Sequence, residues 1–164
     1  MSIQVILQAI EKLTNIHISL LEVSKEKTAS IKEGKIDQLQ TILVKERKDA
    51  QILEQTEAKR LQLVDQWFQE KGIHAEATIS TMLDYILDET EKQQLVDATT
   101  ALTNMITKLK QQEQLNQALI QQSMQFVEIS LDMLNPSLKR MNYGAKRQTT
   151  VPSSESRSVF DSKA

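Results

Sequence analysis

The side chains in this sequence that could support acid–base or metal chemistry are two histidines and a scattered set of carboxylates. The histidines, His17 and His74, do not form an HExxH motif, and the chain has no cysteine to complete the usual zinc ligand sets. It also lacks a glycine-rich phosphate loop and a GxSxG motif. The carboxylates are spaced like solvated residues on outer helix faces. The sequence therefore predicts no enzyme active site, no metal site and no cofactor.

The composition indicates the elements that carry these residues. The chain has 3 glycines and 2 prolines among 164 residues, whereas about 7% and 5% are usual. The first proline is Pro136, and helical periodicity runs through the sequence before it. We therefore expect an all-α protein: an elongated antiparallel helical bundle or coiled-coil hairpin, with a long C-terminal helix and a disordered tail.

Glycines and acidic residues suggest where the helices begin and end. We expect helices over residues 2–32, 35–71 and 78–87, with Gly34 and Gly72 as stops. A last helix should begin in the acidic cluster at residues 88–91 and run to Leu134. Thr90 with Gln93 is a possible capping box for that helix. Two long helices joined by one glycine predict an antiparallel hairpin.

The periodicity also predicts which side chains are buried. His17 falls on the apolar face of the first helix, so a packed histidine is favoured over a ligand. Trp67 and Phe68 should close the hairpin core, with a partner contact as the alternative. Asn116 continues a heptad series in the last helix, where a buried polar residue fixes register. The predicted seam of the second helix contains Ile36, Leu39, Leu43, Ala50, Leu53, Leu61, Val64 and either Trp67 or Phe68.

The last helix carries two apolar stripes after about residue 113. At 100° per residue, one stripe contains Ile120, Met124, Val127, Leu131 and Leu134, and the second contains Leu115, Leu119, Phe126, Ile129 and Met133. Together they span roughly 220°, whereas a surface helix needs about 100° or somewhat more.

Three interpretations of the second stripe remain open. It could face another helix of the same chain, or it could associate with a second copy. It could also bind a partner's amphipathic helix, which the methionines and the glutamine-rich border favour, because methionine adapts to differently shaped partners.

Charge and hydropathy restrict the remaining possibilities. The residues up to Leu138 include 14 Lys and Arg against 20 Asp and Glu, and those from Lys139 include 6 against 2. An acidic body argues against a nucleic-acid-binding domain. No apolar run is long enough to insert into a membrane, and no signal peptide is evident, so a cytoplasmic protein is expected.

We expect a helical domain over 1–138 and a flexible basic tail over 139–164.

Several spaced residues resemble the FlgN family of flagellar export chaperones. They are Leu20-Leu21-Glu22, Lys25-Glu26-Lys27, the run IKEGKIDQL from Ile31 to Leu39, Lys45-Glu46, Arg60, Leu115-Asn116, Leu119-Ile120 and Met141-Asn142-Tyr143-Gly144.

The resemblance implies a specific function. Such proteins keep the hook–filament junction proteins unassembled in the cytoplasm and deliver them to the flagellar type III export gate. The C-terminal helix of the client docks on the late part of the long helix, which here implies contacts from Leu115, Leu119, Ile120, Met124, Phe126, Ile129 and Met133. Tyr143 and Phe160 would then suit a short motif for the export gate, although Phe160 could equally be incidental.

A structural coiled-coil protein is the alternative function. In that case the same apolar face would serve self-association.

Overall fold

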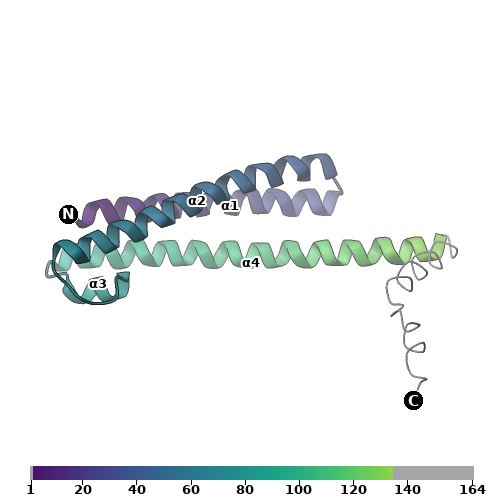
Figure 1. Cartoon of the computed structure of the whole chain (residues 1–164). Coiled ribbons are helices and arrows are strands. Elements are labelled where there is room, and N and C mark those ends of the chain that lie inside the picture. Colours follow the sequence, from purple (N-terminus) through teal and green to yellow (C-terminus); the bar gives the residue numbers. More distant parts are fainter. Residues whose placement is uncertain (1, 135–164) are drawn as a thin grey trace, which may run out of the picture. The chain divides into compact units, whose positions relative to one another are not determined.

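The computed structural model describes residues 2–134, which form four helices and contain no strand. Their bounds are α1 (Ile3–Glu33), α2 (Ile36–Glu70), α3 (Ile79–Tyr85) and α4 (Glu89–Leu134) (Figure 1). The prediction of an all-α fold is confirmed. The chain divides into two compact units, residues 1–120 and 121–164, and α4 contributes to both. The predicted tail, residues 139–164, lies outside the described residues, so the proposed domain boundary stays a prediction.

Short-range hydrogen bonds explain where the helices begin and end. Ser2 caps α1 by accepting the Gln4 N–H at 3.2 Å. Gly34 ends α1 with a φ of 67°, a left-handed conformation that glycine adopts without strain. The predicted Thr90–Gln93 capping box is wrong. Asp88 Oδ1 instead accepts the N–H groups of Thr90 and Glu91 at 2.8 and 2.9 Å, because its carboxylate directly precedes the first turn.

Within the first unit, α1 and α2 form the predicted antiparallel hairpin, and α4 runs along α1 in the same direction (Figure 1). Gln4 pairs with Gln94 near the start of α1 and α4, and Ser24 pairs with Asn116 farther along both helices. A single apolar cluster lies at the end where α3 sits. Its buried members are Ile3, Ile6, Ile10, Val64, Trp67, Phe68, Met82, Ile86 and Leu95.

Trp67 and Phe68 belong to this core, as the first of the two interpretations predicted. Both are 3% exposed, and their rings meet edge to face with centroids 5.2 Å apart. His17 is also buried, and its Nδ1–H donates to the Leu13 carbonyl oxygen at 2.8 Å. His17 is therefore a packed residue of the α1 seam, as predicted, and its ring is hydrogen-bonded within the helix.

The predicted seam of α2 is partly wrong. Leu43 and Leu61 are 43% and 47% exposed, whereas Ile42 and Thr56 are buried. The face that meets α1 carries polar residues that find partners: Glu46 pairs with Lys27, and Asp49 accepts a hydrogen bond from Ser19. Because these half-buried polar groups find partners on α1, α2 can turn a partly polar face inward and leave larger apolar side chains outside.

Replacing Gly34 with alanine should destabilise the hairpin through backbone strain alone. A Cβ at this position meets nothing within 4 Å, so the cost comes from the φ of 67°. We expect the free energy of unfolding to fall by about 1–2 kcal/mol in urea denaturation. Gly34→Asn should lose less, because asparagine tolerates this conformation. An alanine variant as stable as the parent would contradict the role given to Gly34.

Candidate functional site

The residues that could have supported catalysis lie apart. His17 is buried in α1, while His74 is exposed in the loop between α2 and α3. Residues 2–134 hold no cluster of three or more His, Cys, Asp or Glu side chains that could bind a metal. His74 lines an open surface depression of about 510 Å³ with Asp65, Phe68 and Ile73. Its lining also includes the carboxylate of Glu76 and contains no Ser, Thr, Cys or Lys side chain.

The predicted partner-binding residues begin near the end of the first unit. Leu115 and Ile120 are 45% and 41% exposed, and Leu119 is half-buried. Asn116, between them, is buried at 1% exposure. Residues 115–120 therefore mark the point where α4 changes from a packed helix to an exposed one.

The remaining predicted residues lie in the second unit and are all exposed. Met124, Phe126, Ile129 and Met133 are 67%, 72%, 58% and 80% exposed. The other stripe is equally accessible, since Val127, Leu131 and Leu134 are 53%, 48% and 82% exposed. Over residues 121–134 neither stripe belongs to the buried core. Exposed apolar side chains in such number are typical of an interaction surface.

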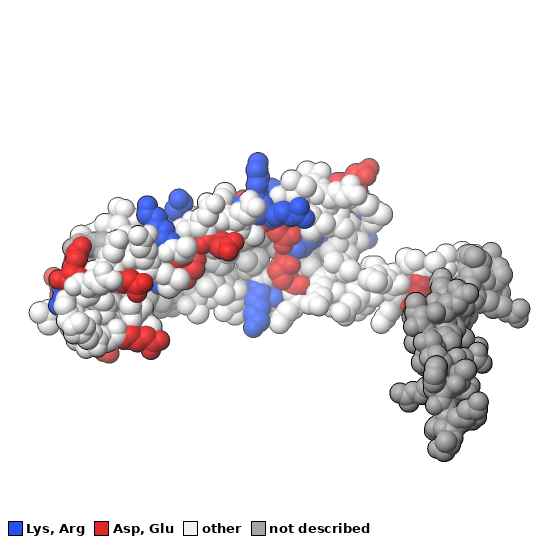
Figure 2. All heavy atoms as spheres, viewed as in Figure 1, with Lys and Arg blue, Asp and Glu red and all other residues white. Residues whose placement is uncertain are grey.

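The same end of α4 is nearly free of charge. From Gln114 to Leu134 the only charged residues are Glu128 and Asp132. Figure 2 shows the contrast, with blue and red side chains spread over the helices of the first unit and few on this part of α4. An apolar surface with so few charges on its border places little electrostatic constraint on its partner.

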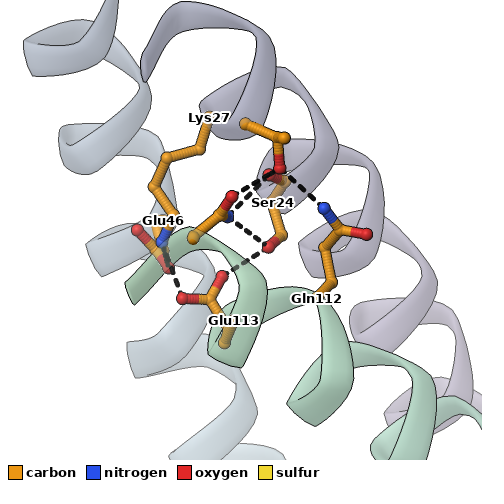
Figure 3. Close-up of polar contacts among 7 residues, drawn as sticks. Ser24, Lys27, Glu46, Gln112 and Glu113 are labelled. Carbon is orange, nitrogen blue, oxygen red and sulfur yellow. Dashed lines mark hydrogen bonds and ion pairs between the residues drawn. The ribbon is translucent and has the colours of Figure 1, made fainter. Parts of the chain in front are cut away.

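Where α4 last packs against the hairpin, seven polar residues from three helices form a connected cluster (Figure 3). Its members are Ser24, Lys27 and Thr28 of α1, Glu46 of α2, and Gln112, Glu113 and Asn116 of α4. We call this set the polar cluster.

Lys27 is the charged centre of the polar cluster. Its Nζ donates to Glu46 Oε1 at 2.7 Å and to Glu113 Oε2 at 2.8 Å, and its side chain is 7% exposed. Burial alone would lower the pKa of Lys27, but the hydrogen bonds and charges of the two glutamates outweigh it and leave the pKa raised. The lysine is thus held as a cation that joins α1 to both α2 and α4.

Asn116 organises the neutral half of the cluster. Its Nδ2 donates to the backbone oxygen and the Oγ of Ser24 at 2.9 and 3.0 Å. Its Oδ1 accepts from Thr28 Oγ1, which in turn accepts from Gln112 Nε2 at 2.6 Å. The predicted burial of Asn116 in the heptad series is confirmed. Because both functions of its amide are satisfied by α1, this contact fixes the register of α4 against α1.

Sequence reasoning predicted a buried polar role for Asn116 alone. Lys27 and Glu46 entered only as residues of the FlgN resemblance, and Ser24, Thr28, Gln112 and Glu113 were missed. A signal was present, because Ser24 and Lys27 follow Leu20 at intervals of four and three residues along the seam of α1. Polar residues at seam spacing on two helices predict a buried polar layer when the helices are paired in the correct register. The sequence alone did not supply that register.

Comparison with known proteins identifies the family. The family model described as FlgN protein matches residues 1–150. The chain belongs to the FlgN family. A Bacillus subtilis (strain 168) relative described as uncharacterized protein YvyG is 33% identical over 164 residues, covering all of both chains. No solved structure matches the chain.

Membership of the FlgN family gives the general function. FlgN proteins are chaperones of flagellum biogenesis rather than a family of enzymes, and they bind flagellar proteins. The resemblance inferred from the spaced helix residues is therefore confirmed. None of the helices in the described range is long and apolar enough to cross a membrane.

Two lysines on α1 provide a matched test of the polar cluster. Lys27→Met keeps the stem but removes two charge-assisted hydrogen bonds, each worth about 1.5–3 kcal/mol. We expect the free energy of unfolding to fall by about 2 kcal/mol. This is less than the two hydrogen bonds together, because the glutamates regain some hydration once the ammonium group is gone. Lys25→Met, which removes an exposed pair with Glu22 at 2.9 Å, should cost about 0–0.5 kcal/mol. Equal losses in urea denaturation would contradict a central role for Lys27.

Proposed function

We propose that this protein is a cytoplasmic chaperone for the hook–filament junction proteins. It binds their C-terminal amphipathic helices, prevents their premature assembly and delivers them to the flagellar type III export gate. The observation that carries the proposal is the exposed apolar end of α4, in a chain that belongs to a family of flagellar chaperones.

The client helix is proposed to bind along residues 115–134 of α4. The contacting side chains are proposed to be Leu115, Leu119, Ile120, Met124, Phe126, Ile129 and Met133. Five of them, Leu115, Leu119, Phe126, Ile129 and Met133, follow the spacing of three, four or seven residues expected for helix-in-groove contacts, and Ile120 and Met124 lie on the neighbouring stripe. Two of the seven are methionines, whose flexible side chains accommodate clients of different shape. Neighbours such as Gln121 and Gln125 carry no charge, so shape and hydrophobicity should determine which helices bind.

The energetics favour occupation of this surface. Burying a large apolar side chain contributes about 1.5–3 kcal/mol, and association costs an estimated 4–15 kcal/mol. Several anchors must therefore be buried together before binding becomes favourable. A client helix meeting only one or two of these residues would not be held, which gives the surface selectivity for helices with a continuous apolar stripe.

The first test is calorimetric titration with a synthetic peptide matching the C-terminal helix of a hook–filament junction protein. We expect the parent to bind and a Phe126→Glu, Ile129→Glu variant to lose binding at least about tenfold, because two anchors become charged. Both residues are exposed in the free protein, at 72% and 58%, so the helix should persist in circular dichroism. Leu43→Glu with Leu61→Glu on α2, at 43% and 47% exposure, serves as the control outside α4.

Undiminished binding by the α4 variant would place the client elsewhere. A parent that binds no such peptide would leave only the general chaperone function of the family.

The alternative, a structural coiled-coil protein, is favoured by the same exposure of both stripes. It requires a stable oligomer that the α4 variant abolishes in light scattering.

Delivery to the export gate is proposed to use the segment beyond the described residues. Tyr143 and Phe160 are the aromatic residues there, and an aromatic side chain is a common anchor in short recognition segments. In a pulldown with the cytoplasmic domain of the export gate, Tyr143→Ala or Phe160→Ala should reduce capture at least about tenfold. Undiminished capture by both variants would remove these residues from the proposal.

A further inference from the structure

The packed face of α4 follows a regular spacing along the first unit. Alternating steps of three and four residues lead from Leu95 through Leu102 and Asn116 to Leu119, and every residue on this line is buried or half-buried. Asn116 shows what the line faces, because its amide is hydrogen-bonded to Ser24 of α1. We call this line of residues the α4 seam.

The α4 seam continues into the second unit. The same steps lead past Leu119 to Ser123, Phe126, Ser130 and Met133. Phe126 and Met133 are 72% and 80% exposed, whereas their counterparts in the first unit are covered by the hairpin. Because the seam keeps its spacing and its large apolar side chains, we expect a second helix to pack along it here as well.

Small and large side chains alternate along this part of the seam. In an antiparallel pair of copies, Ser123 of one copy can lie opposite Met133 of the other, and Phe126 opposite Ser130. Both pairings occur in the same register, because each is centred on residue 128. Every layer then combines one small side chain with one large one, which allows close packing. The seam is therefore complementary to itself when it is reversed.

A parallel pair of copies lacks this complementarity. Ser123 would face Ser123, and Phe126 would face Phe126, so small layers would be underfilled and large layers crowded. The two copies would also meet at Leu119, where each seam is already half-buried by its own hairpin.

The antiparallel pair also fits the limits of α4. With residue 128 at the centre, Leu134 of one copy lies level with Gln122 of the other, and α4 ends at Leu134. Each helix thus ends just before it would reach the packed part of the other copy. A pair shifted deeper by seven residues would place Met133 opposite Asn116, which is already buried against α1.

The charges on this part of α4 do not oppose the pairing. Glu128 and Asp132 are the only charged residues from Gln121 to Leu134. At 100° per residue they lie about 140–180° around the helix axis from the centre of the seam. Both carboxylates therefore stay on the outer side of each helix when the seams of two copies meet.

We propose that two copies of this chain pair antiparallel through residues 121–134 of α4, and that a client helix displaces the second copy. The displacement rests on the proposed function, because Phe126 and Met133 belong both to the seam and to the proposed client site. The contact is only about four helical turns long, so the pairing is weak and reversible. It covers the apolar seam while no client is bound.

Sedimentation of the full-length protein tests the pairing without a client. From about 1 μM to about 1 mM, we expect the mass to rise from one copy to two. Phe126→Glu should weaken dimerisation at least about tenfold, because it places a charge in the seam. Met124→Glu is the matched control, since Met124 is 67% exposed but lies about 140° from the seam. It should change dimerisation less than about threefold.

A monomer throughout this range would overturn the proposal, as would equal losses in the two variants. An oligomer that does not dissociate on dilution would also overturn it, in favour of the structural coiled-coil alternative. Circular dichroism of both variants verifies that the helices persist.

Disulfide formation tests the antiparallel order, because the natural chain has no cysteine. Ser123→Cys and Met133→Cys proteins would be oxidised separately and as a mixture, with a tag on one to distinguish their masses. We expect the mixed disulfide to exceed either self-linked product at least about fivefold, since the two positions lie opposite each other only in the antiparallel pair. Predominance of the self-linked products would overturn this arrangement.

Addition of the junction-protein peptide to the same mixture separates the displacement from the proposed function. A peptide that binds should lower the yield of the mixed disulfide at least about fivefold, because it competes for the seam. Binding without such a loss overturns the displacement and leaves the proposed function standing. If the dimer forms and links as expected but no peptide binds, the proposed client is removed and the self-pairing stands.

Discussion

The arrangement of the first unit depends on one buried cation. Lys27 lies between Glu46 and Glu113 and is the point at which α1, α2 and α4 are joined by charge. A lysine with 7% of its side chain exposed is stable only when its ammonium group is fully paired. Each glutamate must therefore be supplied by its helix at the correct height, and an axial shift of α2 or α4 would separate one pair. Asn116 applies the same restriction to α4 through uncharged groups. The Lys27 ion pairs and the Asn116 amide thus set the register of the three helices, which the apolar core alone would define less sharply.

This register gives α4 two successive roles. Up to Asn116 its inward residues are committed to the hairpin, and after Ile120 its apolar residues are exposed. A continuous apolar seam would let the hairpin slide along α4 and cover part of the exposed stretch. The polar cluster opposes such sliding, because any shifted arrangement would bury Lys27 or Asn116 without partners. The exposed stretch thereby stays uncovered by the hairpin, as the client site that we propose there requires.

The sequence predicted the helices well because their ends are determined locally. Gly34, Gly72 and the carboxylate of Asp88 act within one turn of chain. The seam of α2 was predicted less well, because Leu43 and Leu61 are more hydrophobic than Glu46 or Asp49, whose inward placement depends on partners in α1. The polar cluster was missed for the same reason, apart from Asn116. The wide apolar arc of α4 was visible from periodicity, but its exposure depends on where the other helices end. The helix does not encode which protein it would bind, and the family gives only that flagellar proteins are bound.

The hydrogen bonds between α1 and α4 in the polar cluster join residues 84 to 92 positions apart in the sequence. The α1–α2 hairpin closes over a much shorter loop, so it can form first, and α4 must dock afterwards. During synthesis from the N-terminus, Ser24 and Thr28 therefore lack their α4 partners, and Lys27 is paired with Glu46 alone, until residues 112–116 leave the ribosome. The exposed stretch of α4, residues 121–134, emerges later still, after every residue that forms the first unit. The order of synthesis thus presents these apolar side chains only after the residues that pack the first unit are available to fold.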